Sequence, residues 1–479
     1  MDAFSSFLTT PWVYWTLLAA YTGTILSIVG IILSENRNPV KSLAWITVLM
    51  LFPVGGIILY IFFGRSIKNT HMISRRNRRR LRELTRPEDT EPDLTGLDDE
   101  SRQQIMLARS LTGAQYHTGN KVRIFRDGKE KFDTLLADIA GAREYINLQY
   151  YIFEDDDIGK RVRDALVERA RAGVKVRVIY DHIGSINVRR SFFRSMADEG
   201  IEIHPFFRVA FPLFATRINW RNHRKLVVID GKTGYIGGMN IADRYIDGGK
   251  SGMWRDAHIR IEGPAVGALQ YSFAVDWRFM GRELIEQTVP KTDTPPGNAG
   301  MHLLSCGPTS EWSNIACLLL KAIGNAKKRV LVQTPYFLPT ESLLKALQVA
   351  ALSRVDVRVM MPRHSDSLIL TYASRSYIEE CLRAGVKIYL YDKGMLHSKT
   401  VVIDDTFCSI GSANIDFRSF EHNFEANMFI YSSEVNAEMR RRFDDDLRDS
   451  SRVTAAAWRK RPILHKAFES ILRLLSPVL

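Results

Sequence analysis

Two long apolar runs stand near the start of the chain, and neither contains a charged residue. The first covers residues 12–33 and the second residues 42–64, with only the polar stretch SENRNPVK between them. Each is long enough to cross roughly 30 Å of hydrocarbon as a helix. A cleaved signal peptide followed by a core helix is the alternative, but the first run has Asp2 instead of a basic leader and no small-residue cleavage pattern. We therefore expect two transmembrane helices, about 12–33 and 42–64, joined as a hairpin within residues 1–65.

The remainder of the chain contains one pattern of strands and helices twice. Residues 146–181 have the pattern of an apolar strand, a helix and another apolar strand, and residues 330–362 repeat this order, with Gln149 matching Gln333. Each copy continues into a helix, a strand, and a further strand that follows a histidine. Strands that alternate with helices predict parallel pairing with helices on the sheet. The expected fold is α/β, with two repeated units packed about a pseudo-two-fold axis and preceded by the transmembrane hairpin.

Composition marks the boundaries between these parts. Residues 66–105 form a basic juxtamembrane segment and an acidic, proline-bearing linker, and a second linker covers residues 288–300. The first repeated unit is expected at 106–290 and the second at 301–479. The last residues, 461–479, place apolar side chains at 463/464, 467/468, 471/472 and 474/475, which predicts an amphipathic C-terminal helix. Packing of this helix on the second unit and binding to a membrane fit the pattern equally well.

Much of the net charge of +13 comes from one segment. Residues 65–82 contain eight Lys or Arg and no acidic residue. Such a block is typical of nucleic-acid binding, of a membrane surface or of a solvated segment. Its position directly after the second apolar run favours the membrane, and the positive-inside tendency then places the N-terminus and both repeated units in the cytoplasm. The cations are also expected to attract anionic lipid headgroups.

Each repeated unit contains the same polar constellation near its last shared strand. One His-x-Lys-x4-Asp match is weak, but two matches at equivalent places of a repeat, each followed at the same spacing by a small-residue turn and Asn, are not accidental. The structural alternative, in which His and Lys only cap a strand end, explains one motif but not two. The residues are His223, Lys225, Asp230 and Asn240 in the first unit and His397, Lys399, Asp404 and Asn414 in the second.

These residue types suit substitution at a phosphodiester. The His and Lys of each motif are two residues apart, so they share one face of a strand, and pseudo-two-fold packing can bring both pairs to one cleft. One neutral imidazole can attack phosphorus while the other donates a proton to the leaving oxygen and then acts as base toward the acceptor. The lysines and asparagines can offset charge on the non-bridging oxygens. The motifs contain no carboxylate cluster for a metal, and we expect no cofactor.

The two motifs, HRKLVVID…GGMN and HSKTVVID…GSAN, resemble the HKD motifs of the phospholipase D superfamily. With the stretch ENRNPVKSLAWITVLMLFPVGGIILYIFFGR, the chain is similar over nearly its full length to the bacterial cardiolipin synthases of that superfamily. The resemblance implies that two phosphatidylglycerol molecules are joined into cardiolipin and glycerol through a phosphatidyl-histidine intermediate, without metal. It also implies that Asn240 and Asn414 contact phosphate. The residues alone leave the nucleophile open, and the resemblance favours His223, with His397 as acid and base.

The resemblance assigns further roles to four acidic residues. In that superfamily an acid some distance downstream holds each histidine, and Asp256 and Glu425 stand at such positions here. An acid there would fix the tautomer and stabilise the imidazolium. Asp230 and Asp404 lie five residues beyond their lysines, an odd offset that turns them to the other face. We expect these two to tie down backbone or to bridge the units without touching substrate.

An insertion in the first unit bears on the substrate, because the superfamily also contains nucleases. From Ile203 to His223 is 20 residues, but from Ile388 to His397 is only 9, so the first unit has 11 extra residues within 205–220. The insertion is rich in Phe and Leu, whereas a nucleic-acid channel favours basic residues and isolated stacking aromatics. We expect lipid contact through three of its side chains, although packing of the loop on its own unit is the alternative. The three are Phe211, Leu213 and Phe214.

The predicted function is therefore cardiolipin synthesis at the bacterial inner membrane, with the catalytic units in the cytoplasm. The expected partners are phosphatidylglycerol, other anionic phospholipids and the membrane, with no specific nucleic acid. Two alternatives stay open: a membrane-anchored phospholipase D that hydrolyses phospholipid to phosphatidic acid, and a membrane-tethered nucleic-acid binding protein or nuclease. The sequence leaves the oligomeric state open.

Overall fold

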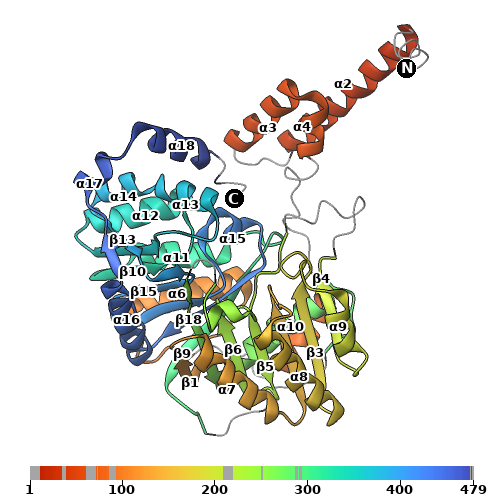
Figure 1. Ribbon diagram of the computed structural model, residues 1–479, viewed down its shortest axis with the longest axis vertical. Coiled ribbons are helices and arrows are strands. Elements are labelled where there is room, and N and C mark those ends of the chain that lie inside the picture. The colour runs from red at the N-terminus through yellow and green to blue at the C-terminus, as the bar shows by residue number, and fades with distance from the viewer. Residues whose placement is uncertain are drawn as a thin grey trace. The chain divides into compact units, whose positions relative to one another are not determined.

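The computed structural model forms two compact units (Figure 1). The N-terminal unit is Met1–Ser66 with Ala210–Asn219, and the main body is Ile67–Val209 with Trp220–Leu479. The described residues are 11–34, 39–60, 72, 74–85, 93–208, 220–249, 252–285, 290, 294–474 and 476.

The described part of the N-terminal unit contains three helices, α2 (Pro11–Ser34), α3 (Pro39–Leu51) and α4 (Pro53–Leu59). The stretch Pro11–Gly30 of α2 is long and apolar enough to cross a membrane, and it is the one such stretch among the described residues. A small apolar cluster joins the three helices, with Ile28, Ile32, Leu49 and Tyr60 at its centre.

The second predicted membrane helix, 42–64, is not one continuous helix. α3 ends at Leu51, and α4 begins at Pro53 after Phe52, whose φ of −127° and ψ of 79° are not helical. Proline has no backbone N–H and disfavours helical geometry at the residue before it, which explains the break. α3 has 13 residues, which span about 20 Å and do not cross the hydrocarbon layer alone. Because residues 61–64 lie outside the described part, the transmembrane hairpin stays a prediction.

The main body is built on one sheet of fifteen strands whose order shows the internal repeat (Figure 1). Outward from the centre, the first repeat has the order β1-β8-β6-β5-β2-β3-β4, and the second has β9-β18-β16-β15-β10-β12-β13, with β19 added at the edge. β1 and β9 pair antiparallel and join the two halves. The expected pair of α/β units with pseudo-two-fold symmetry is confirmed.

The strand bounds of the two repeats correspond. The first repeat contains β1 (His117–Ile124), β2 (Tyr145–Tyr150), β3 (Lys175–Asp181), β4 (Glu202–Phe206), β5 (Leu226–Ile229), β6 (Thr233–Gly237) and β8 (His258–Glu262). The second contains β9 (Ala299–Cys306), β10 (Arg329–Gln333), β12 (Asp356–Pro362), β13 (Lys387–Tyr391), β15 (Thr400–Ile403), β16 (Phe407–Gly411), β18 (Glu425–Tyr431) and β19 (Ser450–Arg452). Two small sheets pair β11 (Phe337–Leu338) with β17 (Ile415–Asp416), and β14 (Gly394–Leu396) with β7 (Met253–Arg255).

The expectation of parallel pairing holds for only part of the sheet. β2, β3 and β4 are parallel, as are β10, β12 and β13, and helices connect them. The strand after each histidine is instead antiparallel to both of its neighbours. A turn of only three residues joins β5 to β6, and it begins with Asp230 and Gly231 at positive φ. So short a turn permits only antiparallel pairing.

Helices cover both faces of the sheet (Figure 1). The buried side chains form several apolar clusters. α10 packs against β5 and α16 against β15, the strands that follow His223 and His397. The helices of the first repeat are α7 (Gly128–Ala140), α8 (Asp157–Arg171), α9 (Arg190–Ala197), the 3-10 turn η3 (Asp243–Tyr245) and α10 (Val266–Phe279). α5 (Arg75–Thr85) packs on α10. The helices around the second repeat are α6 (Asp99–Thr112), α11 (Asn314–Gly324), α12 (Glu341–Leu352), α13 (Leu368–Arg375), α14 (Ile378–Ala384), α15 (Phe417–Glu421), α16 (Ser433–Arg448), α17 (Ala455–Arg459) and α18 (Ile463–Arg473).

Candidate active site

Backbone hydrogen bonds place each histidine at the seam between the repeats. The N–H of His223 donates to the carbonyl of Phe424 at 2.9 Å, and the N–H of Phe424 donates to the carbonyl of Arg221 at 2.8 Å. On the other side, the N–H of His397 donates to the carbonyl of Arg255 at 2.7 Å, just beyond the β14–β7 pair. Each histidine therefore pairs with the segment of the opposite repeat that contains an acid.

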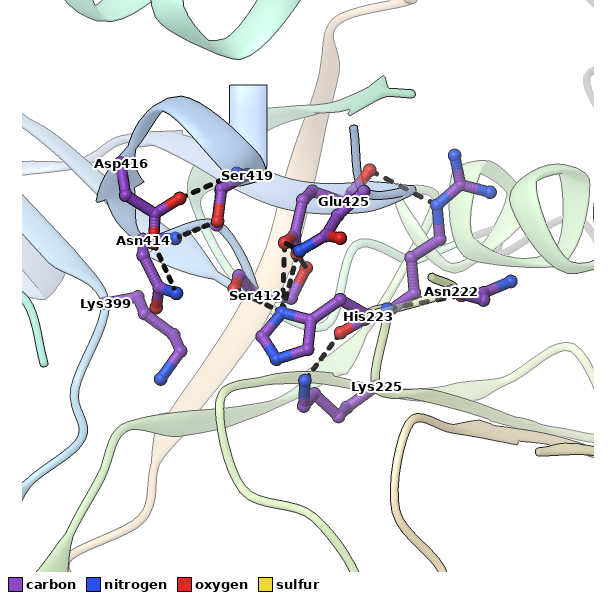
Figure 2. A network of polar contacts seen from close by, with 12 residues as sticks. Asn222, His223, Lys225, Lys399, Ser412, Asn414, Asp416, Ser419 and Glu425 are labelled. Carbon is purple, nitrogen blue, oxygen red and sulfur yellow. Dashed lines mark hydrogen bonds and ion pairs between the residues drawn. The ribbon is translucent and has the colours of Figure 1, made fainter. Parts of the chain in front are cut away.

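Each imidazole contacts the acid of the opposite repeat. His223 points toward Glu425 (Figure 2), and its Nδ1 atom lies 3.0 Å from both carboxylate oxygens. His397 Nδ1 lies 2.6 Å from Asp256 Oδ2. Pairing within one repeat would have joined His223 to Asp256 and His397 to Glu425. The structure shows the opposite pairing, because the backbone pairs cross the seam between the repeats. With Nδ1 donating to a carboxylate in both rings, Nε2 is the nitrogen left for chemistry.

The two acids have different supports. The Ser412 hydroxyl donates to Glu425 at 2.5 Å, and the Asn423 amide donates to it at 3.2 Å. Gly238 occupies the matching position in the first repeat, where a Cβ atom would stand 2.2 Å from Asp256 Oδ1. Glycine is therefore needed there so that the shorter Asp256 can reach across to His397.

Both lysines are buried beside the histidines. Lys225 Nζ donates to the carbonyl of His223 at 2.6 Å. Lys399 Nζ donates to the carbonyl of His397 and lies 3.9 Å from Asp256 Oδ2. Figure 2 places Lys399, from the second repeat, at the same polar centre as His223 and Lys225. The structure thus brings the His-Lys pairs of both repeats together.

The environment keeps the imidazoles neutral and the acids ionised. Burial lowers the pKa of His223 to about 4 and that of His397 to about 3. Burial alone would raise the pKa of Glu425, but the contact with His223 outweighs it and the pKa lies below its usual range. The pKa of Asp256 is likewise lowered against its burial, by Lys399 and His397. At neutral pH each ring therefore donates Nδ1–H to a carboxylate and presents a lone pair on Nε2.

The lysines are also perturbed by burial. The pKa of Lys399 falls to about 8, although Asp256 and Glu425 oppose the shift. Burial lowers the pKa of Lys225 well below its usual value. Among the described residues, no group of three or more His, Cys, Asp and Glu could hold a metal ion. Both lysines lie within electrostatic range of Asp256 and Glu425.

Aromatic side chains lie beside both imidazole rings, and Asn240 holds one of these aromatic side chains, Tyr245. The Tyr151 ring is 4.8 Å from His223, and the Trp254 ring is 5.0 Å from His397. Asn240 donates to the Tyr245 hydroxyl at 3.0 Å, and that hydroxyl lies 3.4 Å from His397 Nδ1. The side-chain oxygen of Asn240 also accepts a hydrogen bond from the Ile152 N–H, so this side chain supports the loop beside the site.

Asn414 differs from Asn240 in its contacts. Its amide donates to Asp416 at 3.0 Å, while its Oδ1 atom is buried with no hydrogen-bond partner among the described residues. Asp416 in turn accepts the Ser419 N–H at the start of α15 (Figure 2). A phosphate contact by either asparagine stays a prediction.

Asp230 and Asp404 face away from the histidines and bind backbone, in line with their odd offset. Asp230 accepts the N–H groups of residues 143, 144 and 145 at 2.8–2.9 Å, just before β2. Asp404 accepts those of residues 327, 328 and 329 at 2.7–2.9 Å, just before β10. Both have φ near +50°. Each acid therefore fastens its turn to the start of the neighbouring strand.

Two further buried acids, Asp276 on α10 and Asp446 on α16, were not anticipated from the sequence. Asp276 accepts from Gln149, Asn222 and Arg224, at 2.6, 3.0 and 2.5 Å, and so holds both neighbours of His223. The counterpart, Asp446, accepts from Gln333 and Arg255, at 2.8 and 2.9 Å, beside Asp256. The Gln149–Gln333 match was the available signal, but it did not identify the acids.

The ends of the apolar insertion pack in an aromatic cluster. Phe206 and Phe207 contact Phe279 and Phe424, beside the acid-bearing segment, and Trp220 contacts Phe207. Residues 209–219, which include the predicted lipid-contact residues Phe211, Leu213 and Phe214, lie outside the described part of the chain. Their contact with lipid stays a prediction.

Comparisons with known proteins agree with this geometry. Residues 135–272 and 319–447 match the family model described as "Cardiolipin synthase, PLD-like domain", and residues 23–65 match "Phospholipase_D-nuclease N-terminal". The chain is 40% identical over 467 residues to the major cardiolipin synthase ClsA of Bacillus subtilis, covering 95% of this chain and 97% of that one. It is also 40% identical over 469 residues to cardiolipin synthase 1 of Staphylococcus aureus, covering 95% of each. The crystal structure of phosphatidylserine synthase from Haemophilus influenzae has the same fold, with a TM-score of 0.61 at 12% identity, covering 80% of this chain and 100% of that one.

Proposed function

This chain belongs to the phospholipase D-like cardiolipin synthases, and on that premise we propose that it transfers a phosphatidyl group from one phosphatidylglycerol to another, giving cardiolipin and glycerol. The observation that carries the proposal is the crossed pair of histidines. Two neutral imidazoles, each with Nδ1 on a buried carboxylate of the other repeat, lie within electrostatic range of both lysines. A single substrate phosphate can therefore meet a nucleophile, a proton donor and two cations.

In the first step, His223 Nε2 attacks phosphorus in one phosphatidylglycerol. The P–N bond forms, the P–O bond to the headgroup glycerol breaks, and the leaving oxygen takes a proton from His397 Nε2. His397 takes up this proton at Nε2 from solvent when the substrate binds, because the anionic phosphodiester adds a negative charge beside a ring already paired with Asp256. Glu425 stabilises the positive charge that develops on His223.

In the second step, the headgroup hydroxyl of another phosphatidylglycerol gives its proton to His397 Nε2 and attacks phosphorus. The P–N bond breaks, and cardiolipin leaves with His223 neutral again. Lys225 and Lys399 offset the charge on the non-bridging oxygens in both transition states. Because their ammonium groups are already bound and buried, little reorganisation is needed as that charge grows.

The membrane setting is part of the proposal. The relatives named above are bacterial cardiolipin synthases, and α2 contains a stretch long enough to span a bilayer. We place the enzyme at the bacterial cell membrane, with the 65–82 cations and the catalytic body on the cytoplasmic side. Phe211, Leu213 and Phe214 of the apolar insertion contact the acyl chains or the bilayer surface.

Product analysis tests the function. The full chain, reconstituted in vesicles of phosphatidylglycerol and phosphatidylcholine, is incubated and its lipids are separated. Cardiolipin and glycerol should form in equal amounts with the wild type and disappear with His223→Ala and His397→Ala. Phosphatidic acid as the sole product would overturn the proposal in favour of hydrolysis, because the same intermediate would then be passing to water.

A further inference from the structure

The C-terminal helix α18 turns its apolar side away from the protein. Its large apolar residues Ile463, Leu464, Phe468, Ile471 and Leu474 are all exposed, and Ile463, Leu464 and Leu474 are 77–80% exposed. At 100° per residue these positions fall within one contiguous side of the helix. An amphipathic helix of a soluble domain normally buries this side. The outward orientation therefore needs a partner that is itself apolar.

Polar contacts fix α18 in this orientation. Glu469, which is only 3% exposed, pairs with Arg461 at 2.5 Å, and the Arg461 guanidinium stacks on the Trp458 ring at 3.4 Å. Arg473 pairs with Glu380 on α14 at 2.5 Å. The inward side is thus held by ion pairs and Leu472, so the helix has one defined outer face.

The outer face continues onto α13, which lies next to α18 (Figure 1). The rings of Tyr372 and Phe468 meet edge to face at 5.2 Å. One turn earlier on α13, Leu368 and Ile369 are also exposed. We call the seven residues the docking face: Leu368, Ile369, Ile463, Leu464, Phe468, Ile471 and Leu474.

The docking face borders the candidate active site. Asp366, two residues before Leu368, accepts a hydrogen bond from the Tyr336 hydroxyl at 2.7 Å. The same Asp366 is close enough to Lys399 to oppose the lowering of its pKa. α13 also contacts β11, which pairs with β17 directly after Asn414, so the docking face lies on elements that adjoin the site.

The charge around the docking face identifies the partner. Residues 452–468 contain Arg452, Arg459, Lys460, Arg461 and Lys466 and no acidic residue. Of these, Arg459 and Lys460 are exposed just before α18 begins. Apolar side chains that enter the acyl boundary, flanked by cations at headgroup level, are the physical signature of helices lying on anionic bilayers.

We propose that the docking face lies in the surface of an anionic phospholipid bilayer, so that the candidate active site is held near the lipid phosphates. This contact is separate from any membrane anchoring by α2. It rests on the proposed function in one respect: lipid substrates explain why a catalytic cleft needs such a contact. The site is then supplied laterally with both phosphatidylglycerols, which never leave the membrane.

A depth measurement on the full chain tests the proposal without relying on turnover. In a Cys317→Ser background, Leu464→Cys is labelled with an NBD fluorophore and reconstituted in vesicles of phosphatidylglycerol and phosphatidylcholine. The matched control is Leu352→Cys, because Leu352 is also an exposed leucine, with 66% of its surface exposed. It lies at the end of α12, before β12 begins, whereas α13 of the docking face follows the other end of β12. Spin-labelled lipid should quench the 464 probe at least twofold more than the 352 probe, and the difference should shrink in pure phosphatidylcholine.

Equal quenching at 464 and 352 would overturn the proposal. A second outcome would also overturn it. If the probe at 464 is shielded from solvent equally in detergent and in vesicles, and spin-labelled lipid does not quench it, a second protein chain covers the docking face. As a functional arm, the double variant Ile463→Ser and Leu464→Ser should lower cardiolipin formation in vesicles by about tenfold and leave it unchanged in detergent micelles. Leu352→Ser should change neither. If the wild type made no cardiolipin, the proposed function would fail, while the quenching result would still decide the docking face.

Discussion

Replacing Glu425 by Gln changes one atom of the site and tests the crossed arrangement directly. Both Glu425 oxygens lie 3.0 Å from His223 Nδ1, and Ser412 and Asn423 already donate to them. An amide in this place keeps the shape but removes the charge and offers an N–H to the ring. His223 would then accept at Nδ1 and have its proton on Nε2, the nitrogen that must attack phosphorus.

The size of the effect follows from the lost interaction. A hydrogen bond to a charged group contributes about 1.5–3 kcal/mol, so its loss in the transition state slows the reaction roughly 10- to 150-fold. The wrong tautomer adds to this, and an acid-to-amide change behind a catalytic imidazole is known to cost about 10⁴-fold. We expect kcat of Glu425→Gln to fall by roughly 10²- to 10⁴-fold, with little change in KM.

Single-turnover kinetics in mixed micelles provide the assay, with phosphatidylglycerol labelled at phosphorus. Glu425→Gln, through the nucleophile His223, and Asp256→Asn, through the acid His397, should both slow the step that forms the covalent intermediate and releases glycerol. Ser412→Ala is the matched control, because it removes a support of Glu425 but leaves the charge beside His223. Its effect should stay within about tenfold, the range of one side-chain hydrogen bond. A Glu425→Gln variant that forms intermediate within threefold of the wild-type rate would refute the reasoning.

Three other outcomes follow from the described contacts. As pH rises through about 8, Lys399 loses its proton and kcat/KM should fall, whereas Lys399→Arg, which stays charged, should move that fall to higher pH in a pH–rate profile. Asp230→Ala leaves three backbone N–H groups without their acceptor and should lower the thermal unfolding midpoint by roughly 5–10 °C. Asp230→Asn should lower it less, because Asn keeps one acceptor oxygen and tolerates positive φ. Gly238→Ala should displace Asp256 and reduce turnover at least 100-fold, while Gly324→Ala, which has no atom within 4 Å of the added Cβ, should be nearly neutral in the same assay.

The sequence predicted the features that depend on local spacing and on the repeat. The two histidine motifs marked equivalent strands, and the sheet order has the symmetry that this implied. The odd offset of Asp230 and Asp404 predicted that they face away from the histidines and either bind backbone or bridge the units, and the structure shows backbone binding. These succeed because side-chain direction along a strand follows from residue number alone.

Features set by tertiary pairing were out of reach of the sequence. Glu425 meets His223 only because residues 221–223 pair with Phe424, about 200 positions away, and no local pattern encodes that pairing. Asp276 acts through α10, a helix that lies between the motifs in sequence and beside His223 in space. Pro53 could be read from the sequence, but whether it interrupts the helix depends on neighbouring groups that can satisfy the freed backbone.

Rapid quenching of the wild-type enzyme during turnover of phosphorus-labelled phosphatidylglycerol tests the central claim most directly. The trapped protein is digested and the labelled peptide is mapped by mass spectrometry. A phosphatidyl group on His223, formed more slowly in Glu425→Gln, is the predicted result. Label on His397, or cardiolipin formation that survives His223→Ala, would contradict the account.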